Sequence, residues 1–388
     1  MDRPGAYLDH GAAAPLDPRV RAAMRPFLDE EFGSPEGLHE WAHVPAEALE
    51  RARGHVAALV GAPEEAVIFT GGDTEARNLA VKGLLSANRG LGRHVVATAV
   101  EHPATLAACR TATRDGGELT LVGVDERGVV APADLAAAVR PDTALVTLPH
   151  GQPEIGTLQD VPALVGAVRA TGSAARVHVD AGATAGLVPV DVAAFGCDAL
   201  TLGGRTMAGP GWVGALVVRP GARIHPLVEG GAQEGGKRAG AVDLAGIVGR
   251  GEAARIAAME MDERAARMRA LAERLIEGLL AVPDVHLNGP RAGRVPGQVQ
   301  VSAGWVDGEA LVLALAEAGV AASPGSACSA DARKAAPVLE AIGLEPPWTH
   351  SAVLFTLGPA TSEAEVDLAA AAFAAAVARL RALSPIAP

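Results

Sequence analysis

Short apolar runs alternate with longer helical stretches between about residues 45 and 255 of the chain. Runs that are apolar throughout, rather than alternating with polar residues, are typical of strands buried on both faces of a sheet. We therefore expect an α/β fold in which helices flank a mainly parallel, seven-stranded sheet. Its strands are expected at residues 66–69, 94–97, 119–122, 144–147, 177–180, 199–202 and 214–218.

The pattern changes near residue 242, where a long stretch rich in Ala, Arg, Glu and Met has helical periodicity up to about residue 282. A strand-like segment at 298–301 follows, then a helix at about 308–318, a Pro/Gly/Ser loop at 323–328 and a closing helix from about residue 362. This second part predicts a smaller α+β domain. We expect a large domain over 16–254 and a small domain made of 1–15 and 255–388, packed together because no low-complexity linker separates them.

Composition narrows the functional classes. The 388 residues are 49% hydrophobic with a net charge of -12, which argues against a general affinity for nucleic acid or anionic membranes. No apolar run is long enough to span a membrane and the first residues lack the apolar core of a signal peptide, so we expect a cytoplasmic protein. The three cysteines are too few for a disulfide framework, and any chemistry that needs a lysine has three candidates, Lys82, Lys237 and Lys334.

Eight sequence blocks occur in an order that is typical of one enzyme family. They are Tyr7-Leu8-Asp9-His10-Gly11-Ala12-Ala13-Ala14-Pro15, Thr70-Gly71-Gly72-Asp73-Thr74-Glu75-Ala76-Arg77-Asn78, Glu101-His102-Pro103, Pro153-Glu154-Ile155-Gly156-Thr157, His178-Val179-Asp180-Ala181, Gly209-Pro210-Gly211, Gly230-Gly231-Ala232-Gln233-Glu234 and Ser326-Ala327-Cys328-Ser329. Over almost its whole length the chain resembles the cysteine desulfurases of the class V aminotransferase group. These are pyridoxal phosphate (PLP) enzymes with the fold type I architecture.

The resemblance implies a role for each retained residue. Asp180 matches the carboxylate that pairs with the ring nitrogen of PLP, and His102 matches the imidazole that stacks on the ring. Thr74 matches a phosphate-binding hydroxyl at a helix N-terminus, which itself favours an anion. Cys328 matches the loop thiol that carries sulfur as a persulfide, a task that needs an accessible thiolate. The resemblance also implies a homodimer, since the family builds each site from both subunits.

The lysine that anchors PLP is missing from its expected place. In the family it lies a few residues before a Gly-Pro pair, and here Thr206 stands there, ahead of Gly209 and Pro210. A hydroxyl cannot form an imine with an aldehyde, so covalent attachment of PLP at Thr206 is excluded and only non-covalent binding remains. Arg205 replaces a phosphate-binding histidine and still offers a bidentate grip on phosphate.

Other positions of the matching site have changed as well. Leu354 replaces the arginine that binds the α-carboxylate of the substrate, which removes a charge-assisted pair. Lys237 is the one lysine whose loop approaches a neighbouring subunit's site in the family, which makes it the candidate substitute for the missing lysine. The remaining departures are Gly203 for serine, Ala183 for glutamine, Pro153 for asparagine and Ala241 for a phosphate-binding threonine.

A purely structural interpretation is open for several of these residues. Asp180 can cap a turn after a buried strand, Thr74 can be a helix N-cap, and His102 can be an ordinary loop histidine before a proline. Cys109 and Cys197 lie in apolar surroundings, as core thiols do. The histidines have no local metal-ligand spacing, so we expect no metal site.

Three functional hypotheses follow. The first is a cysteine desulfurase-like protein with a degenerate PLP site, which handles or transfers sulfur through a Cys328 persulfide rather than by ordinary PLP-dependent desulfuration. Its partners would be a sulfur donor or acceptor protein. The second is a pseudoenzyme subunit paired with an active homologue. The third is repurposed catalysis, in which non-covalently bound PLP, its amine form or another phosphate ligand lies above Asp180. Arg205, His10 and His102 would serve that ligand.

Overall fold

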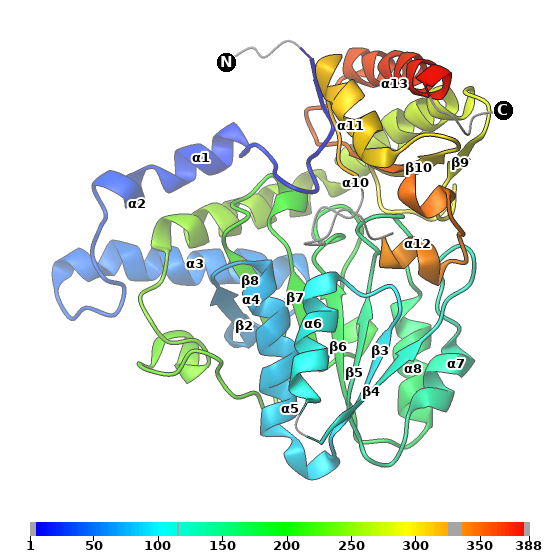
Figure 1. Ribbon diagram of the computed structural model, residues 1–388. Helices are drawn as coiled ribbons and strands as arrows, with labels where there is room; N and C mark the ends of the chain where they lie inside the picture. The colour runs from blue at the N-terminus through cyan, green and yellow to red at the C-terminus, as the bar shows by residue number, and fades with distance from the viewer. Residues whose placement is uncertain (1–4, 115, 325–335, 384–388) are drawn as a thin grey trace.

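A seven-stranded sheet forms the centre of the larger part of the molecule (Figure 1). The computed structural model describes residues 5–114, 116–324 and 336–383. The strand order is β2-β8-β7-β6-β5-β3-β4, with β8 antiparallel to both neighbours and every other pair parallel. The prediction of a mainly parallel, seven-stranded sheet is confirmed. Its strands are β2 (Val67–Thr70), β3 (His94–Thr98), β4 (Glu118–Val122), β5 (Thr143–Pro149), β6 (Arg176–Ala181), β7 (Ala199–Leu202) and β8 (Gly214–Val218).

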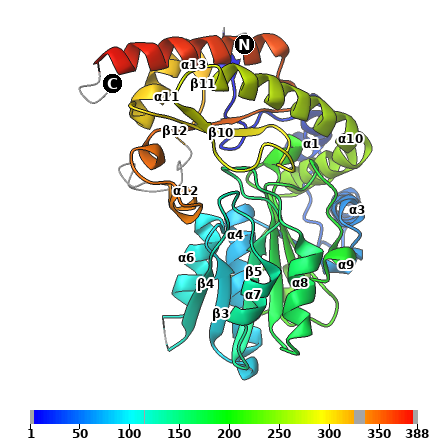
Figure 2. The same cartoon turned by 90° about the vertical axis from the view of Figure 1, so that its right-hand side faces the viewer.

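Helices cover both faces of this sheet, which explains why its inner strands are buried on both sides. Figure 2 shows α4 and α6 on one side of the sheet and α8 on the other. The helices of this part are α1 (Pro18–Met24), α2 (Pro26–Asp29), α3 (His43–Leu59), α4 (Asp73–Asn78), α5 (Leu84–Ala87), α6 (Pro103–Ala112), α7 (Pro132–Ala138), α8 (Val161–Ala170) and α9 (Val192–Phe195).

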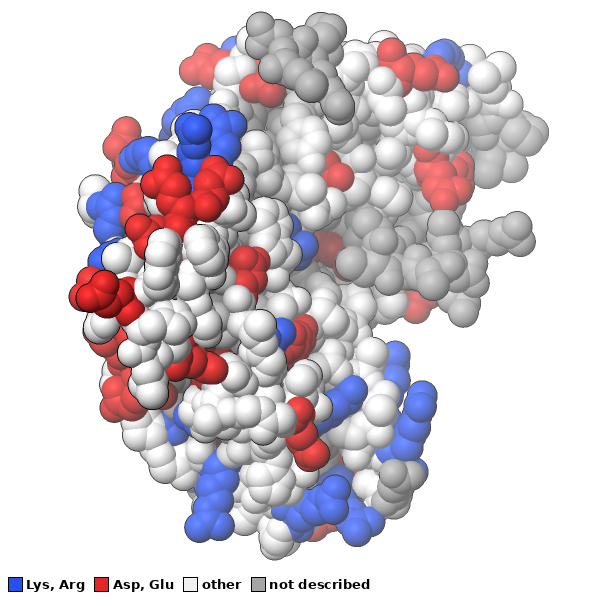
Figure 3. Space-filling model, turned by 90° about the vertical axis from the view of Figure 1, so that its left-hand side faces the viewer, with Lys and Arg blue, Asp and Glu red and all other residues white. Residues whose placement is uncertain are grey.

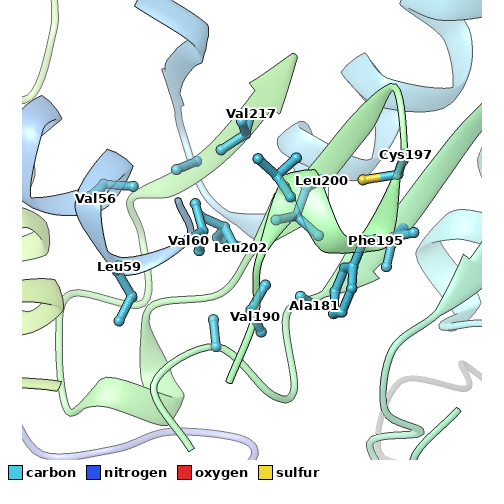
Figure 4. Close-up of a cluster of buried hydrophobic side chains, with 14 of the residues drawn as sticks. Val56, Leu59, Val60, Ala181, Val190, Phe195, Cys197, Leu200, Leu202 and Val217 are labelled. Atoms are coloured by element: carbon cyan, nitrogen blue, oxygen red, sulfur yellow. The ribbon is translucent and has the colours of Figure 1, made fainter. Parts of the chain in front are cut away.

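One face of the sheet packs against α3 through aliphatic side chains (Figure 4). Val56 of α3 and Val60, which follows it, lie near Leu202 of β7 and Val217 of β8. Cys197 belongs to the same cluster, and burial raises the pKa of its thiol to about 12. A thiol with so high a pKa is not a nucleophile near neutral pH, which agrees with the expected role of Cys197 as a core residue.

The smaller part combines the two ends of the chain. It holds an antiparallel sheet in the order β12-β10-β9 and a parallel pair formed by β1 and β11. Phe355 of β12 and Phe373 of α13 are fully buried in its core beside Leu8, which follows β1. The elements are β1 (Ala6–Tyr7), β9 (Val285–Leu287), β10 (Gln298–Ala303), α11 (Gly308–Glu317), β11 (Val320–Ala321), α12 (Pro337–Ala341), β12 (Ala352–Thr356) and α13 (Glu363–Leu383).

The long helix α10 (Leu244–Leu280) connects the two parts (Figure 1). Its first half contributes Ala253 and Ala257 to the core of the sheet, and its second half contributes Leu275 and Leu279 to the core of the smaller part. The expected division of domains at about residue 254 remains a prediction, since the helix is continuous there. None of the helices in the described ranges is both long and apolar enough to cross a membrane.

Candidate functional site

A cavity of about 370 Å³ lies where the carboxyl ends of the sheet strands meet the smaller part. Ligands of open α/β folds bind at this end of the strands. Arg77, His102 and Arg205 line the cavity from the sheet side, and Gln298 and Leu354 line it from the small antiparallel sheet. Much of the remaining wall is apolar, from side chains that include Leu187, Met268 and Leu357.

A buried ion pair joins Arg77 to Asp180 beside this cavity. Nε of Arg77 donates to Oδ2 of Asp180 at 2.5 Å and Nη2 donates to Oδ1 at 3.2 Å. The backbone N–H of Gly182 also donates to Oδ1, at 2.9 Å. Both side chains are at most 5% exposed. Both oxygens of the Asp180 carboxylate are therefore already bonded to groups of this chain.

The local fold explains why these two residues meet. Asp180 lies near the end of β6, and Arg77 lies one helical turn into α4, which begins directly after the loop that follows β2. Gly182 has no side chain, and a Cβ at that position would lie 2.3 Å from Nη2 of Arg77. The guanidinium of Arg77 thus packs directly on the backbone that follows β6.

The charges of this pair set the protonation of its neighbours. Burial alone would raise the pKa of Asp180, but the Arg77 guanidinium outweighs it and holds that pKa at about 2. Burial, reinforced by the positive charge of Arg77, lowers the pKa of His102 to about 4. Burial and the negative charge of Asp180 raise the pKa of Glu101 to about 8. Near neutral pH, Asp180 is therefore ionised and His102 is neutral, while Glu101 is mostly protonated.

A second group of charges lies at the start of α4. Asp73 is 6% exposed, and its Oδ2 lies 3.7 Å from Nη2 of Arg205, whose side chain is 37% exposed. Arg250 of α10 is fully buried, and its charge acts on Asp73. Within the described part of the chain, Oδ1 of Asp73 and all three side-chain nitrogens of Arg250 lack a hydrogen-bond partner. Arg205 is thus the most accessible cation of this group.

The predicted site residues fall into two sets. His102, Arg205 and Thr206 line the cavity, and Asp180 lies beside it in contact with Arg77, which lines it. Thr74 is exposed and is not part of the cavity wall, because the preceding Asp73 faces inward. Their roles toward a ligand remain predictions.

Two of the predicted residues have clear structural contacts. Nδ1 of His102 accepts a hydrogen bond from the N–H of Ala104 at 3.0 Å and so caps the N-terminus of α6. A ring nitrogen that accepts this bond is unprotonated, in agreement with the lowered pKa of His102. Oγ1 of Thr206 donates to the carbonyl oxygen of Ala185 at 2.7 Å, so the hydroxyl is engaged by the backbone.

Three of the departures from the family pattern, Pro153, Ala183 and Leu354, line the same cavity. Lys237 lies elsewhere, in the wall of a separate cavity with Glu36, Arg53 and Glu234. Cys328 and Lys334 lie outside the described residues. Among the residues that the structure describes, no group of three or more His, Cys, Asp or Glu side chains is placed to hold a metal ion.

Sequence reasoning missed three residues of this site, Asp73, Arg77 and Glu101. A signal was present for the first two, because an acid and an arginine four positions apart lie on the same side of a helix that follows a buried strand. For Glu101 the signal was its position next to His102, directly after a buried strand.

Comparison with known proteins places the site in a family context. Residues 6–368 match the family model described as "Aminotransferase class-V". A protein named cysteine desulfurase IscS from Dictyoglomus turgidum is 38% identical over 98% of this chain and 96% of its own length. Cysteine desulfurase IscS 1 from Archaeoglobus fulgidus is 37% identical over 98% of this chain and 99% of its own length. Among solved structures, a "NIFS-like protein" superposes with a TM-score of 0.91 at 30% identity, over 97% of this chain and all of that one.

Proposed function

The chain belongs to the aminotransferase class-V family, and we propose that it is a cysteine desulfurase-like protein with a degenerate PLP site that handles sulfur through Cys328. Relatives named cysteine desulfurases, which match along the full length of the chain, support the desulfurase-like assignment. The proposed function differs in one respect from the activity for which these relatives are named, because it does not include ordinary PLP-dependent desulfuration.

The observation that carries the proposal is the environment of Thr206. The family leads us to expect PLP, whose anchoring needs an amine at this position. Thr206 lines the cavity, and its hydroxyl is hydrogen-bonded to the carbonyl oxygen of Ala185. Lys82 and Lys237 do not line this cavity. Together with the paired Asp180, these residues do not fit covalently held PLP.

The remaining candidate for chemistry is the Cys328 thiol, whose sequence context resembles that of the family's sulfur carrier. Its thiolate would attack the outer sulfur of a persulfide donor, the sulfur–sulfur bond of the donor would break, and the donor thiolate would leave with the electron pair. The product is a persulfide on Cys328, and the exchange needs no external oxidant or reductant. A sulfur donor or acceptor protein is therefore the expected partner.

A homodimer is part of the proposal, and an exposed apolar face supports it. Large apolar side chains between α2 and the start of α3 are strongly exposed, among them Phe32 at 72% and Trp41 at 65%. These two rings pack on each other with centroids 5.7 Å apart. Figure 3 shows this side of the molecule, where uncharged surface lies between groups of acidic side chains. An apolar surface rimmed by charge is typical of a protein interface.

The test measures two reactions of the purified full-length protein. The first is sulfide release from L-cysteine with added PLP and a thiol reductant. The second is sulfur transfer from a low-molecular-weight alkyl persulfide, followed by mass spectrometry of the cysteine-containing peptides. The Cys328→Ser variant is the control for both reactions, and the buried thiols of Cys109 and Cys197 are internal controls within the same molecule.

We expect no sulfide release and the addition of one sulfur to the Cys328 peptide alone. PLP-dependent sulfide release would overturn the loss of ordinary desulfuration. An unmodified Cys328 would overturn sulfur handling and favour a pseudoenzyme subunit that pairs with an active homologue.

A further inference from the structure

We propose that Arg77 is a built-in counter-ion that takes the place of the cofactor's ring nitrogen on Asp180 and closes this pocket to PLP. This inference deepens the proposed function, on which it rests for the assignment of the site. It differs from the loss of the lysine, because it predicts that restoring an amine at position 206 would not restore PLP binding.

Asp180 has little hydrogen-bonding capacity left for a cofactor. Its two oxygens accept three bonds, two from Arg77 and one from the N–H of Gly182. Both lone pairs of Oδ1 are thus engaged, and a protonated ring nitrogen could reach only the second lone pair of Oδ2, directly beside the Nε–H of Arg77. The bidentate arrangement of a guanidinium on a carboxylate is among the strongest hydrogen-bonded pairs in proteins.

Arg77 also fills the space next to Asp180. Arg77, His102, Gly182 and Ala183 are all part of one cavity wall. The guanidinium of Arg77 packs so closely on Gly182 that even a Cβ there would lie 2.3 Å from Nη2. The floor of the cavity next to Asp180 is therefore filled by a side chain of the protein.

The positive charge of Arg77 disfavours a cationic ring beside Asp180. A ring that pairs with Asp180 is cationic when its nitrogen is protonated, and it would lie beside the guanidinium of Arg77, which stays charged near neutral pH. Repulsion between like charges is strong in a buried site, where water screens little. The charges of Arg77 and Asp180 thus neutralise each other without a cofactor. Binding of a cationic ring beside them would be unfavourable.

The experiment restores the lysine with and without Arg77. Four forms of the full-length protein are incubated with PLP, treated with borohydride and digested: Thr206→Lys, Arg77→Ala, Arg77→Ala/Thr206→Lys and Arg53→Ala/Thr206→Lys. Mass spectrometry then measures the fraction of the peptide carrying position 206 that holds a PLP adduct, and absorbance after gel filtration measures total bound PLP. Arg53 is a matched control, because it is another buried arginine paired with a carboxylate, Glu234, away from this cavity.

We expect Arg77→Ala/Thr206→Lys to retain about tenfold more PLP than Thr206→Lys or the Arg53 control, since hydrogen bonds to charged groups contribute about this factor or more. Equal retention by Thr206→Lys alone would overturn the role of Arg77, while the proposed function would stand. The role of Arg77 would also be overturned if Arg77→Ala/Thr206→Lys retained no more PLP than Arg53→Ala/Thr206→Lys. Covalent PLP on the wild-type protein would instead contradict the proposed function.

Circular dichroism shows whether each variant is folded. Where Arg77→Ala does not fold, Arg77→Gln replaces it in the same comparison, because its neutral amide donates to Asp180 without filling the space of a guanidinium. Arg77→Gln/Thr206→Lys should again retain more PLP than Thr206→Lys or the Arg53 control. Equal retention would overturn the role of Arg77.

Discussion

Replacing Glu101 by glutamine is expected to make the protein more stable in mildly alkaline solution. The Glu101 side chain is 4% exposed, so its carboxyl group is almost completely removed from water. Burial and the nearby charge of Asp180 raise its pKa from 4.5 to about 8. The folded protein therefore holds this proton over a pH range in which the unfolded chain has lost it.

The sign and size of the effect follow from this difference. A group whose folded-state pKa is raised contributes fully below the unfolded pKa of 4.5, and its contribution is lost as the pH rises toward 8. Between pH 5 and pH 8 the free energy of unfolding should fall by about 3 to 4 kcal/mol through this group, at no more than about 1.36 kcal/mol per pH unit. Glutamine has nearly the same shape and no charge, so the variant should not lose this free energy.

The measurement is the free energy of unfolding in urea at pH 5, 6, 7 and 8. Glu101→Gln should match the wild type at pH 5 and exceed it by about 3 to 4 kcal/mol at pH 8. Glu317→Gln is the control, because Glu317 forms an exposed pair with Arg379 and its loss should change little at any pH. Parallel pH profiles for Glu101→Gln and the wild type, or a less stable variant at pH 8, would refute the reasoning.

Two further predictions concern the ion pair and the exposed face. Arg77→Met and Asp180→Asn should each lower the free energy of unfolding by about 3 to 5 kcal/mol, because each leaves a buried group unpaired. The double variant Arg77→Met/Asp180→Asn should lose much less than the two single losses added together, and simple additivity in urea unfolding would contradict a coupled pair. Trp41→Asp should convert the expected dimer to a monomer in light scattering, because a charge would replace a central apolar ring; a dimer that persists would exclude this face.

The sheet could be predicted from the sequence because its strands are buried on both faces. Seven apolar runs of four or five residues mark β2 to β8, and their alternation with helical stretches is typical of a parallel sheet covered by helices. Strands of the smaller part were harder to find. β9 is three residues long and half exposed, so it lacks the pattern that marks a buried strand.

The site was predictable only in part. His102, Asp180 and Arg205 were identified by their sequence blocks, and the fold brings them to one cavity or its edge. The ion pair between Asp180 and Arg77 was not predicted. The two residues lie 103 positions apart, and only the tertiary fold brings them into contact. Asp73 and Thr74 illustrate a finer limit. Which of two adjacent polar residues faces inward depends on where α4 begins, and helix ends are the least certain feature of a sequence pattern.

The continuous helix α10 has a consequence for how the protein can move. Its 37 residues extend over about 55 Å, and each half is embedded in a different core. Any motion that opened the cavity between the two parts would have to bend α10 or shift one core along it. Rotation about a flexible linker is not available, because the helix is continuous. α10 also couples the unfolding of the two parts. When either core unfolds, one half of the helix loses the side-chain packing that stabilises it. The two parts should therefore behave mechanically and cooperatively as one body.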